Sequence, residues 1–330
     1  MTDFQWANKT VLVTGAAGFI GSHLTERLVS LGTRARALVH YNSSGSWGWL
    51  DTSPAKDEVE VFQGDVRDPD SLQAAFAGVD VVFHLAALIA IPYSYHAPLS
   101  YVRTNVEGTL NVLQASLGQG VERVVHTSTS EVYGTAQTVP INEAHPLKGQ
   151  SPYSASKIGA DKIAEAFNLS FDLPVTTVRP FNTFGPRQSA RAVIPTIITQ
   201  ALNDETISLG NLEPTRDLNY VADTVEGFIK AAESPKAIGE VINLGTGQEI
   251  SIRDLAQRIL KLLNKNLPVV SKDERLRPEK SEVDRLCADA SRAHSLLGWS
   301  SKYSLDEGLA ETIRWIEANA DRFRQGVYVI

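Results

Sequence analysis

The chain has 330 residues, and 43% of them are hydrophobic, which is enough to bury one large core or two moderate ones. Lys and Arg total 31 against 38 for Asp and Glu, and the resulting net charge of -7 argues against a nucleic-acid surface, which requires a basic face. The single cysteine, Cys287, excludes an intrachain disulfide and a cysteine-based metal site and is typical of a reducing compartment. No apolar leader is evident, and the longest strongly apolar run, Val81–Ile91, is too short to cross a bilayer, so we expect a cytoplasmic protein without a membrane partner.

Short β-branched segments alternate with helical stretches along the first half of the chain, a pattern typical of βαβ units. These segments are apolar throughout, as expected for parallel strands that helices cover on both faces. Past Pro180 the pattern loosens into loops, followed by one further strand and two helices. The expected strands are Val11–Thr14, Ala35–His40, Val59–Gln63, Val81–His84, Arg123–Thr127, Val175–Arg179 and Val241–Leu244, and the later helices lie near 252–263 and 305–318.

We therefore predict an α/β fold, a doubly wound parallel sheet of the Rossmann type with a smaller mixed α/β substrate lobe near the C-terminus. The dinucleotide-binding domain is expected to span residues 1–180 plus a returning segment at about 216–245. The substrate-binding lobe is expected to comprise residues 181–215 and 246–330. Ligands of such folds bind beyond the carboxyl ends of the strands, so the residues that follow each strand are the candidate site.

Three glycines stand between the first expected strand and the helix after it, in the run Gly15-Ala16-Ala17-Gly18-Phe19-Ile20-Gly21. Gly15 permits a sharp turn, Gly18 lets the backbone approach a pyrophosphate, and Gly21 lets the helix pack against the sheet. The helix N-terminus adds N–H donors and a positive dipole, so this position predicts a dinucleotide site. The residues expected to contact the cofactor here are Gly15, Ala17, Gly18, Phe19 and Ile20.

The end of the second strand does not identify the cofactor. An acidic residue there usually holds the adenosine ribose of NAD, but this chain has His40, Asn42 and Ser43 instead. These side chains can donate hydrogen bonds to a 2′-phosphate, yet no arginine is present, so NAD and NADP both stay open. The other positions expected to contact the cofactor are Asp65, Val66, Leu85, Ala86, Ala87, Thr127 and Pro180.

A Tyr-x-x-x-Lys pair opens a later helix, where Ser151 is suited to cap the helix and Pro152 to its first turn. Tyr153 and Lys157 are then neighbours on one helical face. An ammonium about 6 Å from the phenol, at an effective dielectric constant of ~20, is worth roughly 2.8 kcal/mol and lowers the phenol pKa by about two units. The pair therefore predicts a tyrosine that accepts a hydroxyl proton while hydride leaves the same carbon, with both residues also contacting the cofactor.

These motifs resemble the extended short-chain dehydrogenase/reductase superfamily over nearly the whole chain. The superfamily includes nucleotide-sugar 4-epimerases, 4,6-dehydratases, decarboxylases and reductases, so the resemblance implies a nucleotide-sugar enzyme without choosing its reaction. It also implies a homodimer formed by the helices around 98–117 and 153–167. The matching motifs are Gly15–Gly21, Asp65–Val66, His84–Ala87, Asn105–Thr109, Tyr153 to Lys157, Arg179–Asn182 and Gly185–Arg187.

The residue types in the segment Thr129-Ser130-Glu131, after the fifth strand, distinguish between these reactions. In the superfamily, epimerases typically have small non-acidic residues at the position of Glu131, whereas a 4,6-dehydratase requires a carboxylate to remove the C5 proton. The sequence resembles GDP-mannose 4,6-dehydratases, with Thr-Ser-Glu here, and departs from the Thr-Asp-Glu of dTDP-glucose 4,6-dehydratases. We predict that Thr129, Ser130 and Glu131 join Tyr153 and Lys157 as catalytic residues. The acid for the departing C6 hydroxyl is left open between Ser130 and a protonated Glu131.

The segment from Tyr153 to Gln200, together with Pro214–Asp217, resembles the dehydratases of bacterial legionaminic-acid pathways, which act on GDP- or UDP-N-acetylglucosamine. A cationic fork suits a diphosphate, so the resemblance implies arginines as its ligands. The residues expected to bind substrate are Asn182, Arg187, Val193, Arg216 and Arg277.

The predicted reaction oxidises C4 through Thr129 and Tyr153, eliminates water from C5 and C6 through Glu131, and returns the hydride to C6. The cofactor, NAD or NADP, is then tightly bound and regenerated in each turnover. A nucleotide-sugar 4-epimerase, in which Glu131 only hydrogen-bonds the sugar, is the alternative. A non-catalytic NAD(P)-sensing protein is a more distant one, since such proteins commonly lose the Tyr or the Lys. No metal site is expected, because no carboxylate spacing surrounds His84 or His126.

Overall fold

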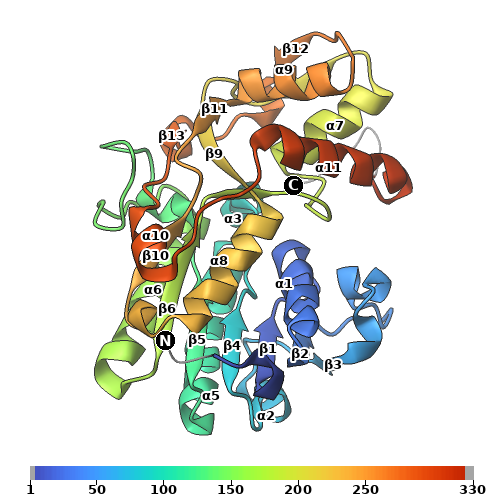
Figure 1. Cartoon of the computed structure of the whole chain (residues 1–330). Coiled ribbons are helices and arrows are strands. Elements are labelled where there is room, and N and C mark those ends of the chain that lie inside the picture. Colours follow the sequence, from blue (N-terminus) through green and yellow to red (C-terminus); the bar gives the residue numbers. More distant parts are fainter. Residues whose placement is uncertain (1–3, 324–330) are drawn as a thin grey trace.

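A seven-stranded parallel sheet organises the computed structural model, which describes residues 4–323 (Figure 1). The strand order is β10-β6-β5-β4-β1-β2-β3, so the chain winds outward in both directions from β1, as in dinucleotide-binding folds. Residues 1–3 and 324–330, which the predicted domains include, lie outside the described part. The strands are β1 (Thr10–Thr14), β2 (Arg34–Val39), β3 (Val59–Gln63), β4 (Val81–His84), β5 (Arg123–Thr127), β6 (Val175–Pro180) and β10 (Val241–Leu244).

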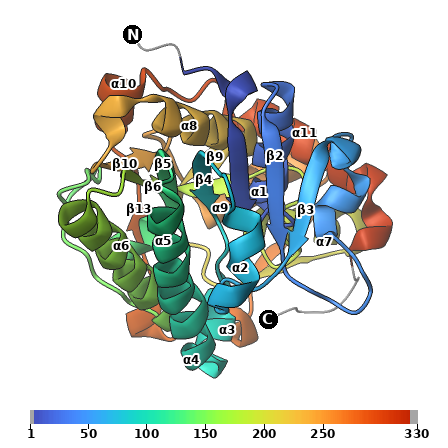
Figure 2. The ribbon, with the colours of Figure 1, turned by 90° about the horizontal axis from the view of Figure 1, so that it is seen from below.

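Helices cover both faces of this sheet, so that strands β1, β4 and β6 are buried along their whole length. On one face lie α2 (Pro69–Phe76), α5 (Gly108–Gln119) and α6 (Pro152–Phe171), side by side in Figure 2. On the other face lie α1 (Phe19–Ser30) and α8 (Val221–Glu233). The predicted doubly wound α/β fold is confirmed.

The connection from β4 to α5 carries α3 (Ile91–His96), α4 (Pro98–Tyr101) and a π-helical segment, 102–107. Such segments are frequent near functional sites. Asn105 lies on it and is fully buried. Its side-chain amide donates to Leu88 O at 3.0 Å and to Ser156 Oγ at 2.9 Å, and its carbonyl accepts from Leu88 N at 2.9 Å. Asn105 therefore joins the segment after β4 to the first turns of α6.

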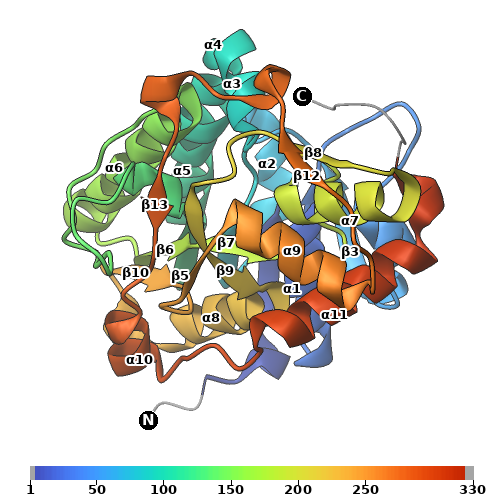
Figure 3. The ribbon, with the colours of Figure 1, turned by 90° about the horizontal axis from the view of Figure 1, so that it is seen from above.

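The smaller lobe stands where the parallel strands end (Figure 3). Its sheet pairs β9 (Thr215–Tyr220) with β7 (Asn182–Phe184), β11 (Glu249–Ser251) and β13 (Arg285–Leu286), and β8 (Ile207–Leu209) pairs separately with β12 (Val269–Ser271). Mixed strand directions agree with the predicted mixed lobe. Its helices are α7 (Val193–Asn203), α9 (Ile252–Leu262) and α11 (Leu305–Ala318), while α10 (Ser291–Leu297) packs beside β10.

The chain returns to the main sheet later than predicted. The expected boundary at residue 216 falls inside β9, which pairs within the smaller sheet. The return begins with α8, which packs against β5 and β6, and ends with β10, which pairs with β6. Across residues 4–323, no helix is both long and apolar enough to span a membrane.

Candidate active site

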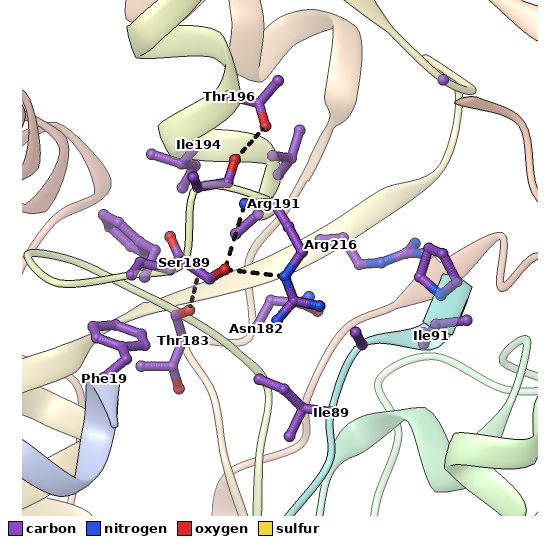
Figure 4. Close-up of a pocket in the computed structure, with 18 of the residues that line it drawn as sticks. Phe19, Ile89, Ile91, Asn182, Thr183, Ser189, Arg191, Ile194, Thr196 and Arg216 are labelled. Carbon is purple, nitrogen blue, oxygen red and sulfur yellow. Dashed lines mark hydrogen bonds between the residues drawn. The ribbon is translucent and has the colours of Figure 1, made fainter. Parts of the chain in front are cut away.

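A cavity of about 1360 Å³ lies between the carboxyl ends of the main strands and the smaller lobe. It exceeds the usual range of pockets for a single small ligand, so it has room for two ligands side by side. Most of the predicted site residues line it, and Figure 4 shows Phe19, Asn182 and Arg216 among them. The predicted residues that line the cavity are Gly15, Gly18, Phe19, Ile20, Leu85, Ala86, Ala87, Thr127, Thr129, Ser130, Glu131, Tyr153, Lys157, Pro180, Asn182, Arg187, Val193, Arg216 and Arg277.

The glycine turn between β1 and α1 is packed so closely that side chains do not fit. Gly15 has φ +72°, and a Cβ on it would lie 2.8 Å from Ala86 N. A Cβ on Gly21 would lie 2.2 Å from Gly15 O. Gly18 is the N-cap of α1 and lines the cavity, so the positive end of the helix faces the open space without an acidic residue in its first turn. This arrangement fits the pyrophosphate of a dinucleotide.

Six other predicted cofactor residues are not part of the cavity wall: Ala17 in the glycine turn, and His40, Asn42, Ser43, Asp65 and Val66, which follow β2 and β3. Both carboxylate oxygens of Asp65 accept from Arg67, which lowers the pKa of Asp65 to about 2. His40 Nε2 lies 3.3 Å from the same carboxylate. Asn42 holds its own loop by bonds to the backbone of Ser46. The structure thus brings His40 and Asp65 together at the edge of the cavity.

The Tyr-x-x-x-Lys pair opens α6 as predicted. A capping box between Ser151 and Ser154 fixes the start of the helix, and Lys157 Nζ donates to Thr127 O at 2.6 Å. Burial lowers the pKa of Lys157 to about 8. Burial also raises the pKa of Tyr153 well above its usual value, while a hydrogen bond with Thr129 lowers it.

The expectation that Lys157 lowers the pKa of the Tyr153 phenol below its usual value is therefore wrong. Tyr153 is only 7% exposed, and its ring packs edge-on against Tyr101 with the centroids 6.2 Å apart. Loss of hydration disfavours the phenolate more strongly than nearby donors favour it. Further positive charge in the cavity is needed before Tyr153 becomes a base near neutral pH.

Glu131 follows β5 on a short 3-10 turn, 130–133, and is 9% exposed. Its backbone N–H donates to Thr129 Oγ1 at 3.3 Å, which orients the turn. Within residues 4–323 its carboxylate has no hydrogen-bond or ion-pair partner. The charge of Glu131 adds to the burial that raises the pKa of Tyr153 on one side, and on the other it partly offsets the burial that lowers the pKa of Arg216. The carboxylate is therefore available to a ligand between these two groups.

The predicted substrate residues line the cavity from two directions, since Arg216 and Arg277 belong to the smaller lobe whereas Arg187 contacts Ser22 and Glu26 of α1. Arg216 and Arg277 both approach Glu282, at 3.5 and 3.3 Å. Asn182 presents a buried side-chain oxygen with no hydrogen-bond partner, which favours a donor from a bound ligand. Arg187 is paired with Glu26 at 2.8 Å and has φ +69°, an unusual backbone conformation that is frequent at functional sites.

Arg191 was not predicted from the sequence. It precedes α7, is exposed, and points into the cavity that Asn182 and Arg216 also line (Figure 4). Its Nε donates to Ser189 Oγ at 3.2 Å, and no carboxylate among residues 4–323 pairs with it. The sequence feature that could have indicated Arg191 is its position two residues before the apolar run that begins at Val193.

His84 and His126 form hydrogen bonds within the core. His84 Nδ1 lies 2.8 Å from Thr14 Oγ1 and Nε2 lies 3.0 Å from Thr109 Oγ1. His126 Nε2 lies 3.2 Å from Asp161. Over the part of the chain that the structure describes, no group of His, Cys, Asp and Glu is arranged to hold a metal.

A family model described as GDP-mannose 4,6 dehydratase matches residues 12–312. The chain belongs to this family. A UDP-glucose 4-epimerase of Mycolicibacterium smegmatis is 35% identical over 92% of this chain and 97% of its own. A dTDP-glucose 4,6-dehydratase of Actinoplanes sp. is 31% identical over 94% and 98%. The solved dTDP-glucose 4,6-dehydratase of Streptomyces venezuelae with NAD bound is 30% identical, covers 96% and 99%, and has a TM-score of 0.85.

These relatives confirm the resemblance to extended short-chain dehydrogenases/reductases and the Rossmann-type fold. The GDP-mannose 4,6 dehydratase family thus places this chain among NAD-dependent enzymes of nucleotide-sugar dehydratase, epimerase and decarboxylase type. An epimerase and a dehydratase match it about equally well. The reaction has to be argued from the site.

Proposed function

We propose that this protein is a nucleotide-sugar 4,6-dehydratase that converts an NDP-hexose, GDP- or UDP-N-acetylglucosamine by the resemblance above, to the 4-keto-6-deoxy sugar. Glu131 carries the proposal, because it is a buried carboxylate on the cavity wall with no partner among the described residues. An epimerase needs only to oxidise and reduce C4. A dehydratase needs a base for C5 beside the tyrosine that acts on C4, and Glu131 influences the charge of Tyr153 from that position.

The glycine turn and the N-terminus of α1 would hold the pyrophosphate of NAD or NADP, and Lys157 and Thr127 stand where the nicotinamide ribose would lie. NAD is favoured, because related solved structures contain it. His40 and Ser43 keep NADP as the alternative. When bound and oxidised, the cofactor would supply the hydride acceptor for C4 and, once reduced, the hydride donor for C6, so that it would not be consumed. Its positive charge would also favour the Tyr153 phenolate that burial now disfavours.

The residues of this chain would act in sequence. Thr129 and Tyr153 bind the C4 hydroxyl, and Tyr153 takes its proton as C4 becomes a ketone. The ketone acidifies the C5 proton, which Glu131 removes. The C6 hydroxyl then leaves as water, taking the proton from Glu131 or from Ser130, and a C5–C6 double bond forms. Hydride returned to C6 and a solvent proton added at C5, with the C4 hydroxyl proton released from Tyr153 to solvent, would complete the product without net oxidation.

The substrate wall supports a nucleoside diphosphate sugar. Arg216 and Arg277 share one carboxylate, Glu282, so this cluster holds more positive than negative charge. A diphosphate oxygen suits the donors that Glu282 does not satisfy. Arg187, Arg191, Asn182 and the start of α7 at Val193 complete the wall.

The experiment is incubation with GDP- and UDP-N-acetylglucosamine, followed by mass spectrometry of the product. A dehydratase gives a product lighter by one water, whereas an epimerase leaves the mass unchanged. In Glu131→Gln, dehydration should fall by about 10² to 10⁴ while bound cofactor is retained. Glu143→Gln is the control, because this acid lies outside the cavity and accepts from Asn243 N. Unchanged dehydration in Glu131→Gln would remove Glu131 from the C5 step. A wild type that gives an epimer of unchanged mass would make the 4-epimerase the better assignment, to which the 35% identity with the Mycolicibacterium smegmatis UDP-glucose 4-epimerase also points.

A homodimer in the cytoplasm is proposed as well. Apolar side chains are exposed on the neighbouring helices α4, α5 and α6, together with the π-helical segment. Apolar side chains exposed on adjoining helices favour an interface with a second copy of the chain. The side chains are Leu99, Val102, Leu117, Leu169 and Phe171. Light scattering of the purified protein measures the association directly.

A further inference from the structure

A fully buried carboxylate stands behind the catalytic pair. Asp161 lies on α6 one turn after Lys157 and is 4% exposed. It accepts hydrogen bonds from Ser128 Oγ at 2.8 Å, from Arg179 Nη2 at 2.9 Å and from His126 Nε2 at 3.2 Å. No part of the reaction proposed above uses it.

The donors of Asp161 come from the strands that deliver the catalytic groups. Ser128 lies between Thr127, whose carbonyl accepts from Lys157, and Thr129, which bonds to Tyr153. Arg179 is the penultimate residue of β6, immediately before Pro180 on the cavity wall. One carboxylate therefore joins α6, β5 and β6 at the level where their side chains enter the site.

The charge of Asp161 has a second consequence. Lys157 and Arg179 are both buried, and Asp161 raises the pKa of each. His126 does not add a third cation, since burial lowers its pKa and its Nδ1 is buried without a partner, as a neutral ring allows. No ion pair within 4 Å joins Lys157 to Asp161, so the effect on Lys157 acts through space. The titratable and charged groups around this pair are Tyr153, His84, His126, Arg179 and Glu131.

We propose that Asp161 is a positioning residue that keeps Lys157 charged and holds α6 in register with β5, so that the Tyr153–Lys157 pair can act. The inference rests on the C4 oxidation of the proposed function. That step is shared by dehydratases and epimerases, so the choice between them does not affect it.

The variant Asp161→Asn tests the charge while preserving the shape. An asparagine oxygen can still accept from Arg179, and a neutral His126 can change tautomer to accept from its amide, so the hydrogen bonds can be remade. The titration of Lys157 is followed by NMR of protein with ¹³C-labelled lysine, as purified, with the signal assigned by its loss in Lys157→Ala. In parallel, reduction of the bound cofactor on mixing with GDP- or UDP-N-acetylglucosamine is followed by absorbance across pH.

We expect Lys157 to titrate near pH 8 in the wild type, and about one unit lower or more in Asp161→Asn. The alkaline limb of the oxidation rate should move by the same amount. Asp223→Asn is the matched control, since Asp223 is buried and accepts from Lys302 N and Tyr303 N, so this variant should lose stability without moving either titration.

The same Lys157 titration in Asp161→Asn as in the wild type would overturn the proposal, as would a wild-type Lys157 that is neutral well below pH 7. The second outcome is measurable even if Asp161→Asn does not fold. A wild type that reduces no cofactor with any sugar would count against the proposed function instead, because the NMR titration does not depend on substrate.

Discussion

The two sides of the cavity are built differently. The cofactor side consists of backbone, glycines and buried side chains whose hydrogen bonds lie within the chain, such as Lys157 on Thr127 and Asn105 on Leu88. The substrate side consists of arginines on loops and short strands, with several donors left for a ligand. A rigid wall built largely from backbone suits a group common to many reactions, whereas side chains on loops vary more readily between related proteins. The contrast explains why family membership indicates the chemistry more firmly than it indicates the substrate.

The largest expected effect tests the rigidity of the cofactor side. In Gly21→Ala the new Cβ would lie 2.2 Å from Gly15 O, and neither backbone can move without displacing the turn. We expect the free energy of unfolding to fall by about 3 kcal/mol and bound cofactor to be lost. Urea denaturation and the absorbance of the purified protein measure these quantities. Gly118→Ala is the control, because nothing lies within 4 Å of its new Cβ in α5, and it should be neutral or stabilising. Similar losses of stability and cofactor in both variants would show that the glycine turn can accommodate the added Cβ.

The next effect tests the substrate side. Arg216 is 6% exposed, and Arg216→Ala removes a buried cation that the cavity offers to an anionic ligand. Charge-assisted hydrogen bonds contribute roughly 1.5 to 3 kcal/mol, so KM should rise by about 10- to 100-fold with bound cofactor retained. Steady-state kinetics with the nucleotide sugar provides the measurement. Arg258→Ala, which breaks a surface pair with Asp306, should leave KM unchanged. An unaltered KM in Arg216→Ala would remove this arginine from the substrate site.

The pH dependence of the rate tests the role of the Lys157 ammonium on the cofactor side. The pKa of Lys157 is lowered to about 8, so its ammonium is present below that pH and is lost as pH rises through it. We expect the rate of cofactor reduction to decline above about pH 8, by roughly tenfold per unit. Stopped-flow absorbance between pH 6 and 10 tests this. A rate that is flat to pH 10 would mean that the ammonium is not required.

The contrast between the two sides of the cavity also explains which features could be predicted from the sequence. The observed strand limits are close to the predicted ones, since a segment such as Val81–His84, apolar in sequence and buried along its whole length, fits a strand covered on both faces. The glycine turn and the Tyr153–Lys157 pair were predictable because local spacing fixes both. The partners of Arg187 and Arg216 were not, since Glu26 and Glu282 are distant in sequence and only the fold brings them close. The raised pKa of Tyr153 depends on burial, which spacing does not reveal.

The smallest effect concerns Arg191, which the sequence analysis missed. Its guanidinium is exposed and anchored to Ser189 by a single side-chain bond, so most of its interaction with an anion is screened by solvent. Arg191→Ala should raise KM by roughly two- to fivefold at low salt, and less at high salt. Measuring KM at two ionic strengths, with Arg314→Ala as a control on the far surface of α11, distinguishes a substrate contact from a general charge effect. A salt-independent rise would instead indicate that Arg191 shapes the loop before α7, and the substrate side would then share the rigidity of the cofactor side.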